Sequence, residues 1–171
     1  MLEDAVAELW LSDSLLERGF DPLLPAPPTL AQPDVLFAGL RWDRCLVSQR
    51  KLEAWGAPLP YRRADSTTEG PAIGVPLDLA RELARSQGGR LPRVEEWEAA
   101  VVDAAPGNHG MRWGGPSEAG AFPAARSGIL DGWGNAWEWT EDGVAVGGSF
   151  ASPPHPSPRE APRLTSFRVV R

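Results

Sequence analysis

Few side chains in this sequence are of the types that carry covalent or redox chemistry. Cys45 is the only cysteine among 171 residues, so no internal disulfide can form. The two histidines, His109 and His155, have no short spacing and no neighbouring carboxylate motif, so they do not predict a facial triad for iron. The sequence also contains no phosphate-cradling glycine loop and no nucleophile elbow. These features favour binding over catalysis.

A proline-rich segment near the C-terminus has the residue types of a recognition loop. Five prolines between positions 153 and 162 order the chain in advance, which lowers the entropy lost on binding. Arg159 and Arg163 could pair there with an acidic or carboxylate-bearing partner, although an ordinary solvated loop is the alternative. Aromatic and arginine side chains dominate binding energy when buried. The predicted recognition face comprises Trp113, Phe150, His155, Arg159 and Arg163.

The first 33 residues are expected to form a helix and a stiff connection ahead of the main domain, residues 34–171. Five apolar residues recur at helical spacing, and Gly19 is a typical C-terminal cap: Leu2, Val6, Leu9, Trp10 and Leu16. Five prolines at positions 22–33 then exclude a helix or a central strand. Since an isolated helix of this length is marginal in water, its apolar face must be covered by the domain, a second copy or a partner.

The main domain is expected to alternate short strands with three helices and then to become irregular. Apolar runs at 34–42, 43–48 and 73–75 predict strands. One helix should begin after Ser48 and end at Gly56, and another should begin at Pro76 and end at Gly88. A third should have Pro92 in its first turn, where Glu95, Glu96 and Glu98 would favour the helix dipole instead of acid–base chemistry. From residue 106 onward only loops and small strands are expected.

Composition and charge exclude several classes of partner. The net charge is −6 and the 17 basic residues form no cluster, which argues against nucleic acid and anionic membranes as partners. Acidic residues at positions 3, 4 and 8 stand where a signal peptide would need basic ones, so a cytoplasmic location is expected. Eight tryptophans with 18 glycines and 18 prolines indicate a loop-rich fold in which indoles pin the loops.

Four motifs in the C-terminal half together resemble one known family. They are GGRLPRVEEWEAA (88–100), DGWGNAWEWTED (131–142), VAVGGSF (144–150) and SFRVVR (166–171). In type and order these resemble the formylglycine-generating-enzyme domain, the sulfatase-modifying-factor branch of C-type-lectin-like folds. The resemblance implies an irregular α+β domain with a small antiparallel sheet and two or three helices.

The same resemblance bears on metals. Copper-dependent members carry two cysteines five residues apart after the GGS strand, and these positions fall here on Ser152 and Ser157. Because a hydroxyl is a poor ligand for Cu(I), no copper is expected. Family members resembling loop 131–138 hold calcium, which transfers to Asp131, Gly134, Ala136 and Glu138 as ligands of a structural ion. The alternative is that Glu138 bonds amides of its own loop and Asp131 caps a turn.

The interpretation is therefore a non-catalytic C-type-lectin-like binding module that recognises a protein or small-molecule ligand through its C-terminal loops. One alternative is a formylglycine-generating-type oxidoreductase, or a metal-enzyme subunit, acting on a peptidyl cysteine. Another is a display protein of the phage or diversity type. Whether the chain is an enzyme stays open at this point, because fold does not fix function.

Overall fold

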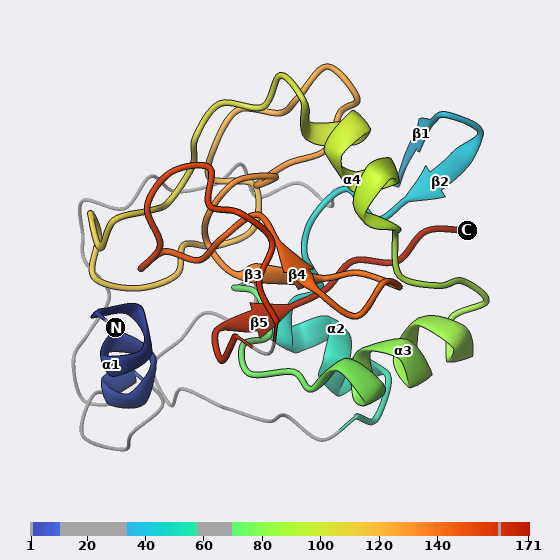
Figure 1. The fold of residues 1–171 in the computed structure, drawn as a ribbon. Coiled ribbons are helices and arrows are strands. Elements are labelled where there is room, and N and C mark those ends of the chain that lie inside the picture. Colours follow the sequence, from blue (N-terminus) through green and yellow to red (C-terminus); the bar gives the residue numbers. More distant parts are fainter. Residues whose placement is uncertain (1, 11–33, 58–69, 161) are drawn as a thin grey trace.

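The computed structural model describes residues 2–10, 34–57, 70–160 and 162–171, which form short helices and strands among long loops (Figure 1). The elements, in order, are α1 (Leu2–Trp10), β1 (Val35–Phe37), β2 (Leu40–Trp42), α2 (Gln49–Ala54), α3 (Leu77–Ser86), α4 (Val94–Val101), β3 (Trp137–Trp139), β4 (Ala145–Val146) and β5 (Thr165–Ser166). None of the helices in the described part has the length and apolar character needed to cross a membrane.

Two small sheets carry all the regular strands of the described chain. β1 and β2 form an antiparallel hairpin whose turn, Ala38 and Gly39, has positive φ angles of 49° and 77°. The second sheet has the order β4-β3-β5, with β3 antiparallel to β4 and parallel to β5. The expected antiparallel sheet is thus mixed. Its central residue Glu138 stands opposite Val146 on one side and Ser166 on the other.

Two of the predicted strands do not form. In segment 43–48 the carbonyl of Arg44 accepts from the Leu130 amide and the Arg168 side chain, so the chain bends there instead of continuing a ladder. In segment 73–75 the carbonyl of Val75 accepts from the Trp139 indole at 2.6 Å and the Thr165 hydroxyl at 2.8 Å. Side-chain donors therefore occupy some of the carbonyls that a regular strand would pair, and the remaining backbone bonds of these segments are isolated ones. Local apolar patterns do not reveal such bonds.

The three helices of the main domain follow their predicted boundaries closely. Ser48 caps α2 by accepting from the Lys51 amide at 3.2 Å, and Pro76 immediately precedes α3. α4 begins two residues after Pro92, because Glu96 turns back to accept from the Arg93 amide at 2.8 Å. The N-terminal helix is also present as α1, while residues 11–19 and the proline-rich connection at 22–33 lie outside the described residues.

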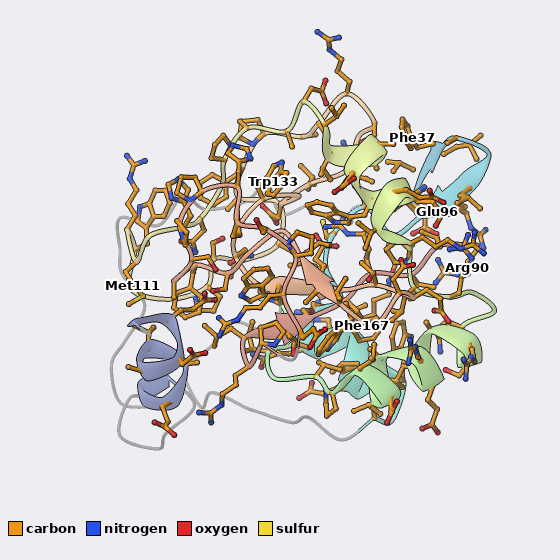
Figure 2. The ribbon with its side chains drawn as sticks, in the orientation of Figure 1. Phe37, Arg90, Glu96, Met111, Trp133 and Phe167 are labelled. Atoms are coloured by element: carbon orange, nitrogen blue, oxygen red, sulfur yellow. The ribbon has the colours of Figure 1, made fainter. Side chains whose placement is uncertain are left out.

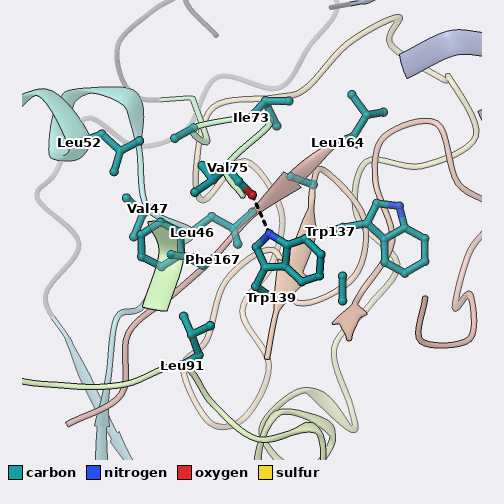
Figure 3. Packing of buried hydrophobic residues seen from close by; sticks show 14 of the residues in the cluster. Leu46, Val47, Leu52, Ile73, Val75, Leu91, Trp137, Trp139, Leu164 and Phe167 are labelled. Carbon is teal, nitrogen blue, oxygen red and sulfur yellow. Dashed lines mark hydrogen bonds between the residues drawn. The ribbon is translucent and has the colours of Figure 1, made fainter. Parts of the chain in front are cut away.

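Indole rings dominate two adjoining hydrophobic clusters. The first surrounds β3 and is covered by α2 and α3, with Trp139 donating to the Val75 carbonyl inside it (Figure 3). Trp42 and Trp97, both fully buried, form the centre of the second beneath α4. The tryptophans of the recognised motifs, at positions 97, 133, 137 and 139, are expected from the sequence to be core residues. This is confirmed for Trp97, Trp137 and Trp139, whereas Trp133 is only partly buried against the second cluster. The clusters hold β3 and β4 rigidly, and the loops after β4 start from this base.

Candidate functional site

A tight turn after β4 brings two serine hydroxyls together. Gly147 and Gly148 have positive φ angles of 86° and 78°, and a Cβ on Gly148 would lie 2.6 Å from Cγ of Pro156. The Ser149 amide donates to Oγ of Ser152 at 2.8 Å, and the two Oγ atoms are 3.2 Å apart. Only glycine permits this turn, which packs the proline-rich segment against the buried hydroxyls.

The carboxylate of Glu3, on α1, lies against these hydroxyls. Its Oε1 accepts from Oγ of Ser149 at 3.0 Å, from Oγ of Ser152 at 2.9 Å and from Nε1 of Trp137 at 2.5 Å. Its Oε2 accepts from Nη1 of Arg159 at 3.2 Å. Donors from β3, the turn after β4 and the proline-rich segment thus surround one carboxylate, which is only 15% exposed.

The two arginines of the predicted recognition face both meet acidic groups of α1. Nη2 of Arg159 donates to Oδ1 of Asp4 at 2.7 Å, and Arg163 lies 3.4 Å from Glu8. The hydrogen bond from Arg159 holds the pKa of Asp4 below its ordinary value of 3.8. The arginines therefore bind carboxylates in this structure, but the carboxylates belong to the same chain, and a role toward an external ligand stays a prediction.

Trp113 and His155 lie on loops that flank the turn. The loop before Trp113 is attached to the turn through two backbone bonds, from Gly110 to Ser152 at 2.8 Å and from Met111 to Phe150 at 2.7 Å. Trp113 is half-buried, and the guanidinium of its neighbour Arg112 lies 4.7 Å from its ring centre.

His155 is exposed, and its ring packs edge-on against Trp133 at 4.5 Å (Trp133 is labelled in Figure 2). Phe150 differs from the expectation of a recognition residue, since it is fully buried in the first cluster. Phe150 therefore supports the face from beneath and does not form part of it. The unbroken apolar run at 144–146, close before Phe150, could have indicated this burial.

The two positions at which the family resemblance places copper-binding cysteines differ in environment. Ser152 is fully buried and bonded to Glu3, whereas Ser157 is exposed. The thiol of Cys45 lies elsewhere, where burial, and after it the nearby Asp131 carboxylate, raises its pKa to about 12. A thiol with this pKa is protonated at neutral pH and is neither a good nucleophile nor a good metal ligand.

In the predicted calcium loop, a buried arginine meets Glu138. Nε and Nη2 of Arg168 donate to its two carboxylate oxygens at 2.5 and 2.7 Å, and both side chains are at most 1% exposed. Arg168 also donates to the carbonyls of Arg44 and Leu130, each at 3.2 Å. The partner of Glu138 is thus a side chain that neither sequence interpretation named.

Asp131, at the start of the same loop, is buried with a positive φ of 53°. Its Oδ2 accepts from the Gly120 amide at 2.5 Å, while its Oδ1 has no hydrogen-bond partner within the described residues. Burial raises the pKa of Asp131 to about 6, against the opposing effect of the Gly120 amide. One buried guanidinium, that of Arg168, faces two buried carboxylates, so this region has one excess negative charge when both are ionised.

Three residues of the site around the turn were missed from the sequence: Glu3, Trp137 and Ser149. Trp137 was assigned to the core, and it is buried there, but its indole N–H points at the Glu3 carboxylate. The available signal was charge complementarity. Acidic residues at positions 3, 4 and 8 match arginines at 159 and 163 in a chain whose basic residues are otherwise scattered.

Comparisons with known proteins bear on the fold. No family model matches the sequence, and no curated protein matches it. Among solved structures, PvdO from Pseudomonas aeruginosa is 19% identical with a TM-score of 0.60, over 91% of this chain and 88% of its own. CarF is 16% identical with a TM-score of 0.58, over 77% of this chain and 85% of its own. Both neighbours are formylglycine-generating-enzyme-like, and at these identities the likeness concerns the fold alone. The chain accordingly has the formylglycine-generating-enzyme-like fold that its four motifs predicted.

Proposed function

We propose that this chain is a non-catalytic binding module that recognises a protein or small-molecule ligand through its C-terminal loops, residues 150–163. One observation carries the proposal. Where copper-dependent members are expected to present a thiolate, Ser152 presents a buried hydroxyl that donates to a carboxylate. A hydroxyl group in this position serves recognition by hydrogen bonding, whereas Cu(I) requires soft sulfur ligands.

The geometry of the loops supports a binding role. Residue 159 is fixed to β4 by two backbone bonds, because Arg159 and Ala145 exchange amide and carbonyl at 2.8 Å in both directions. Phe150 anchors the other end of the segment in the core. His155 and Arg163 are exposed between and beyond these anchors. A loop held in this way loses little entropy when a ligand binds.

Calcium in loop 131–138 is a second part of the proposal, as a structural ion. The donor set fits a hard cation, since Oδ1 of Asp131 is buried with no hydrogen-bond partner among the described residues, and one guanidinium faces two carboxylates. Asp131 and Glu138, with the carbonyls of Gly134 and Ala136, would hold the ion. It would stabilise the loop that leads into β3 and take no part in ligand chemistry. We also propose a cytoplasmic location, and Cys45, a free and half-buried thiol, is compatible with a reducing compartment.

Two measurements test the binding role against catalysis. Anaerobic titration with Cu(I), followed by oxygen uptake with a cysteine-containing peptide, should show neither tight stoichiometric copper binding nor formylglycine formation. Ligand capture by the full chain should be reduced by His155→Ala and Arg163→Ala at unchanged Tm. Arg126→Ala is the matched control, because Arg126 is 95% exposed on another loop. Copper-dependent conversion of the peptide, or equal loss of capture in the control, would overturn the proposal.

A further inference from the structure

The contact between α1 and the turn after β4 has the composition of a carboxylate-binding site. The groups directed at Glu3 are all donors: two hydroxyls, one indole N–H and one guanidinium. The guanidinium of Arg159 is 28% exposed, whereas Ser149 and Ser152 are fully buried. Hydrogen bonds to a charged carboxylate are about twice as strong as neutral ones, and an arginine adds charge to them.

The donors are held in place by the domain and not by α1. The hydroxyls of Ser149 and Ser152 are fixed by the turn itself, through the Ser149 amide at 2.8 Å and the Ala151 amide at 3.2 Å. Trp137 lies in the central strand β3, and Arg159 is bonded through its backbone to β4. A site that is ordered independently of its occupant is suited to more than one occupant.

The occupant, by contrast, is weakly tied to the domain. α1 has nine residues, a length at which a helix is marginal by itself. Ala7 is buried and Val6 partly buried against the first cluster, and the other described contacts of α1 are ionic or polar. Twenty-four residues, 11–34, separate α1 from β1 in the sequence, and a chain of this length can span roughly 80 Å. The covalent link thus permits α1 to leave the site without moving the domain.

We propose that Trp137, Ser149, Ser152 and Arg159 form a binding site for an external carboxylate, which Glu3 occupies in cis as a tethered competitor. This inference rests on the proposed binding role and specifies its ligand chemistry. The carboxylate belongs either to a small molecule or to an acidic peptide that replaces α1. Because a tethered group competes at an effective concentration in the millimolar range, an external ligand must bind well or carry several acidic groups.

Chemical rescue in the full-length chain tests the site. Glu3→Ala removes the occupant and leaves the donors, and propionate is the probe that can refill the space. The Trp137 indole N–H resonance should shift in Glu3→Ala and return toward its wild-type position on saturation with propionate. Propionamide, which has the same shape without the charge, should bind at least about tenfold more weakly. Wild type and Glu8→Ala, a control on the same helix whose side chain is 78% exposed, should not respond to propionate.

A blocked peptide of sequence LEDAVAELW, added in place of propionate, distinguishes the two sources of carboxylate. Affinity at least tenfold above that of propionate assigns the site to an acidic peptide, and comparable affinity assigns it to a small carboxylate. If Glu3→Ala does not fold, Glu3→Ser, which also empties the space that the carboxylate fills, replaces it with the same indole readout.

The inference is overturned if the Trp137 resonance is unchanged on loss of Glu3, if propionamide rescues as well as propionate, or if Glu8→Ala responds equally. Rescue by propionate without any ligand capture that depends on His155 and Arg163 would contradict the proposed binding role and support the carboxylate site. Ligand capture without rescue of Glu3→Ala by propionate would contradict the carboxylate site and leave the proposed binding role intact.

Discussion

The buried pair between Glu138 and Arg168 should be the most sensitive point of the fold. Both side chains are at most 1% exposed, and two hydrogen bonds of 2.5 and 2.7 Å join them. Removing one member of such a pair leaves an uncompensated buried charge, which costs about 3–5 kcal/mol. We expect Glu138→Gln to lower the free energy of unfolding by about this amount. For a chain of this length, that corresponds to a fall in Tm of roughly 6–20 °C.

Arg168→Met should cost more than Glu138→Gln, because the guanidinium also faces the carboxylate of Asp131 and donates to two carbonyls. The double variant carries neither charge of the pair, so its loss should not exceed that of Arg168→Met alone. The double-mutant cycle formed by these variants should therefore give a coupling energy of at least about 3 kcal/mol. Urea unfolding at pH 7 in the presence of a chelator measures it without interference from calcium.

Glu96→Gln provides the matched control. Arg90 and Glu96 form an equally bidentate pair, with both bonds at 2.7 Å, beside α4 (Figure 2). Their side chains are 35% and 23% exposed, so loss of the charge should cost under about 1 kcal/mol. Two results would refute the reasoning from burial. One is a near-additive loss of unfolding free energy in the variants at positions 138 and 168, and the other is a loss in Glu138→Gln no larger than that in Glu96→Gln.

Three further predictions follow from the same structure. A chelator should lower the wild-type Tm, and calcium at one hundred times its Kd should restore roughly 5–10 °C. The Tm of Glu138→Ala should respond to neither addition, and a wild-type Tm unchanged by the chelator would exclude the ion. The hydrogen bond from Arg90 lowers the pKa of Glu96 below its ordinary value of 4.5, so the pair stabilises the fold above that pH. This contribution is lost as the pH falls through the lowered pKa. The Tm between about pH 5 and 3 should therefore fall less steeply in Glu96→Gln than in the wild type. Cys45, with a pKa raised to about 12, should react with a disulfide reagent at pH 8 at least about a hundredfold more slowly in the folded chain than in urea, and equal rates would contradict its burial.

Sequence reasoning located the elements whose signals are local. Helix boundaries depend on a cap or a proline, and Ser48, Pro76 and Gly88 stand where expected. Three of the four motif indoles expected in the core, at 97, 137 and 139, are buried there, and the fourth, Trp133, is only partly buried. The predicted strands at 43–48 and 73–75 are not regular, because some of their carbonyls accept from side chains distant in the sequence, such as Trp139 and Arg168. Their other backbone bonds, to residues 165–169 among others, are isolated and do not build a ladder. Apolar pattern alone cannot contain that information.

The candidate site was harder to predict because its parts come from the two ends of the chain. Arg159 and Arg163 were identified by residue type, yet their partners, Asp4 and Glu8, are about 155 residues away. The pairing of Glu138 with Arg168 was equally hidden, although both residues belong to recognised motifs. A motif fixes the identity of a residue but not the partner that determines its charge state.

A serine hydroxyl at position 152 has the opposite binding preference to the cysteine thiolate that the family resemblance would place there. A pair of thiolates offers electron pairs to a soft cation, whereas a serine hydroxyl can offer its hydrogen to an anion. Ser152 donates a hydrogen bond to a carboxylate here, as do Ser149, Trp137 and Arg159. The indole N–H of Trp137 and the guanidinium of Arg159 can only donate hydrogen bonds. The turn after β4 therefore positions donors around a carboxylate. Likeness of fold alone cannot reveal this binding preference, because the polarity of the site depends on a few side-chain atoms.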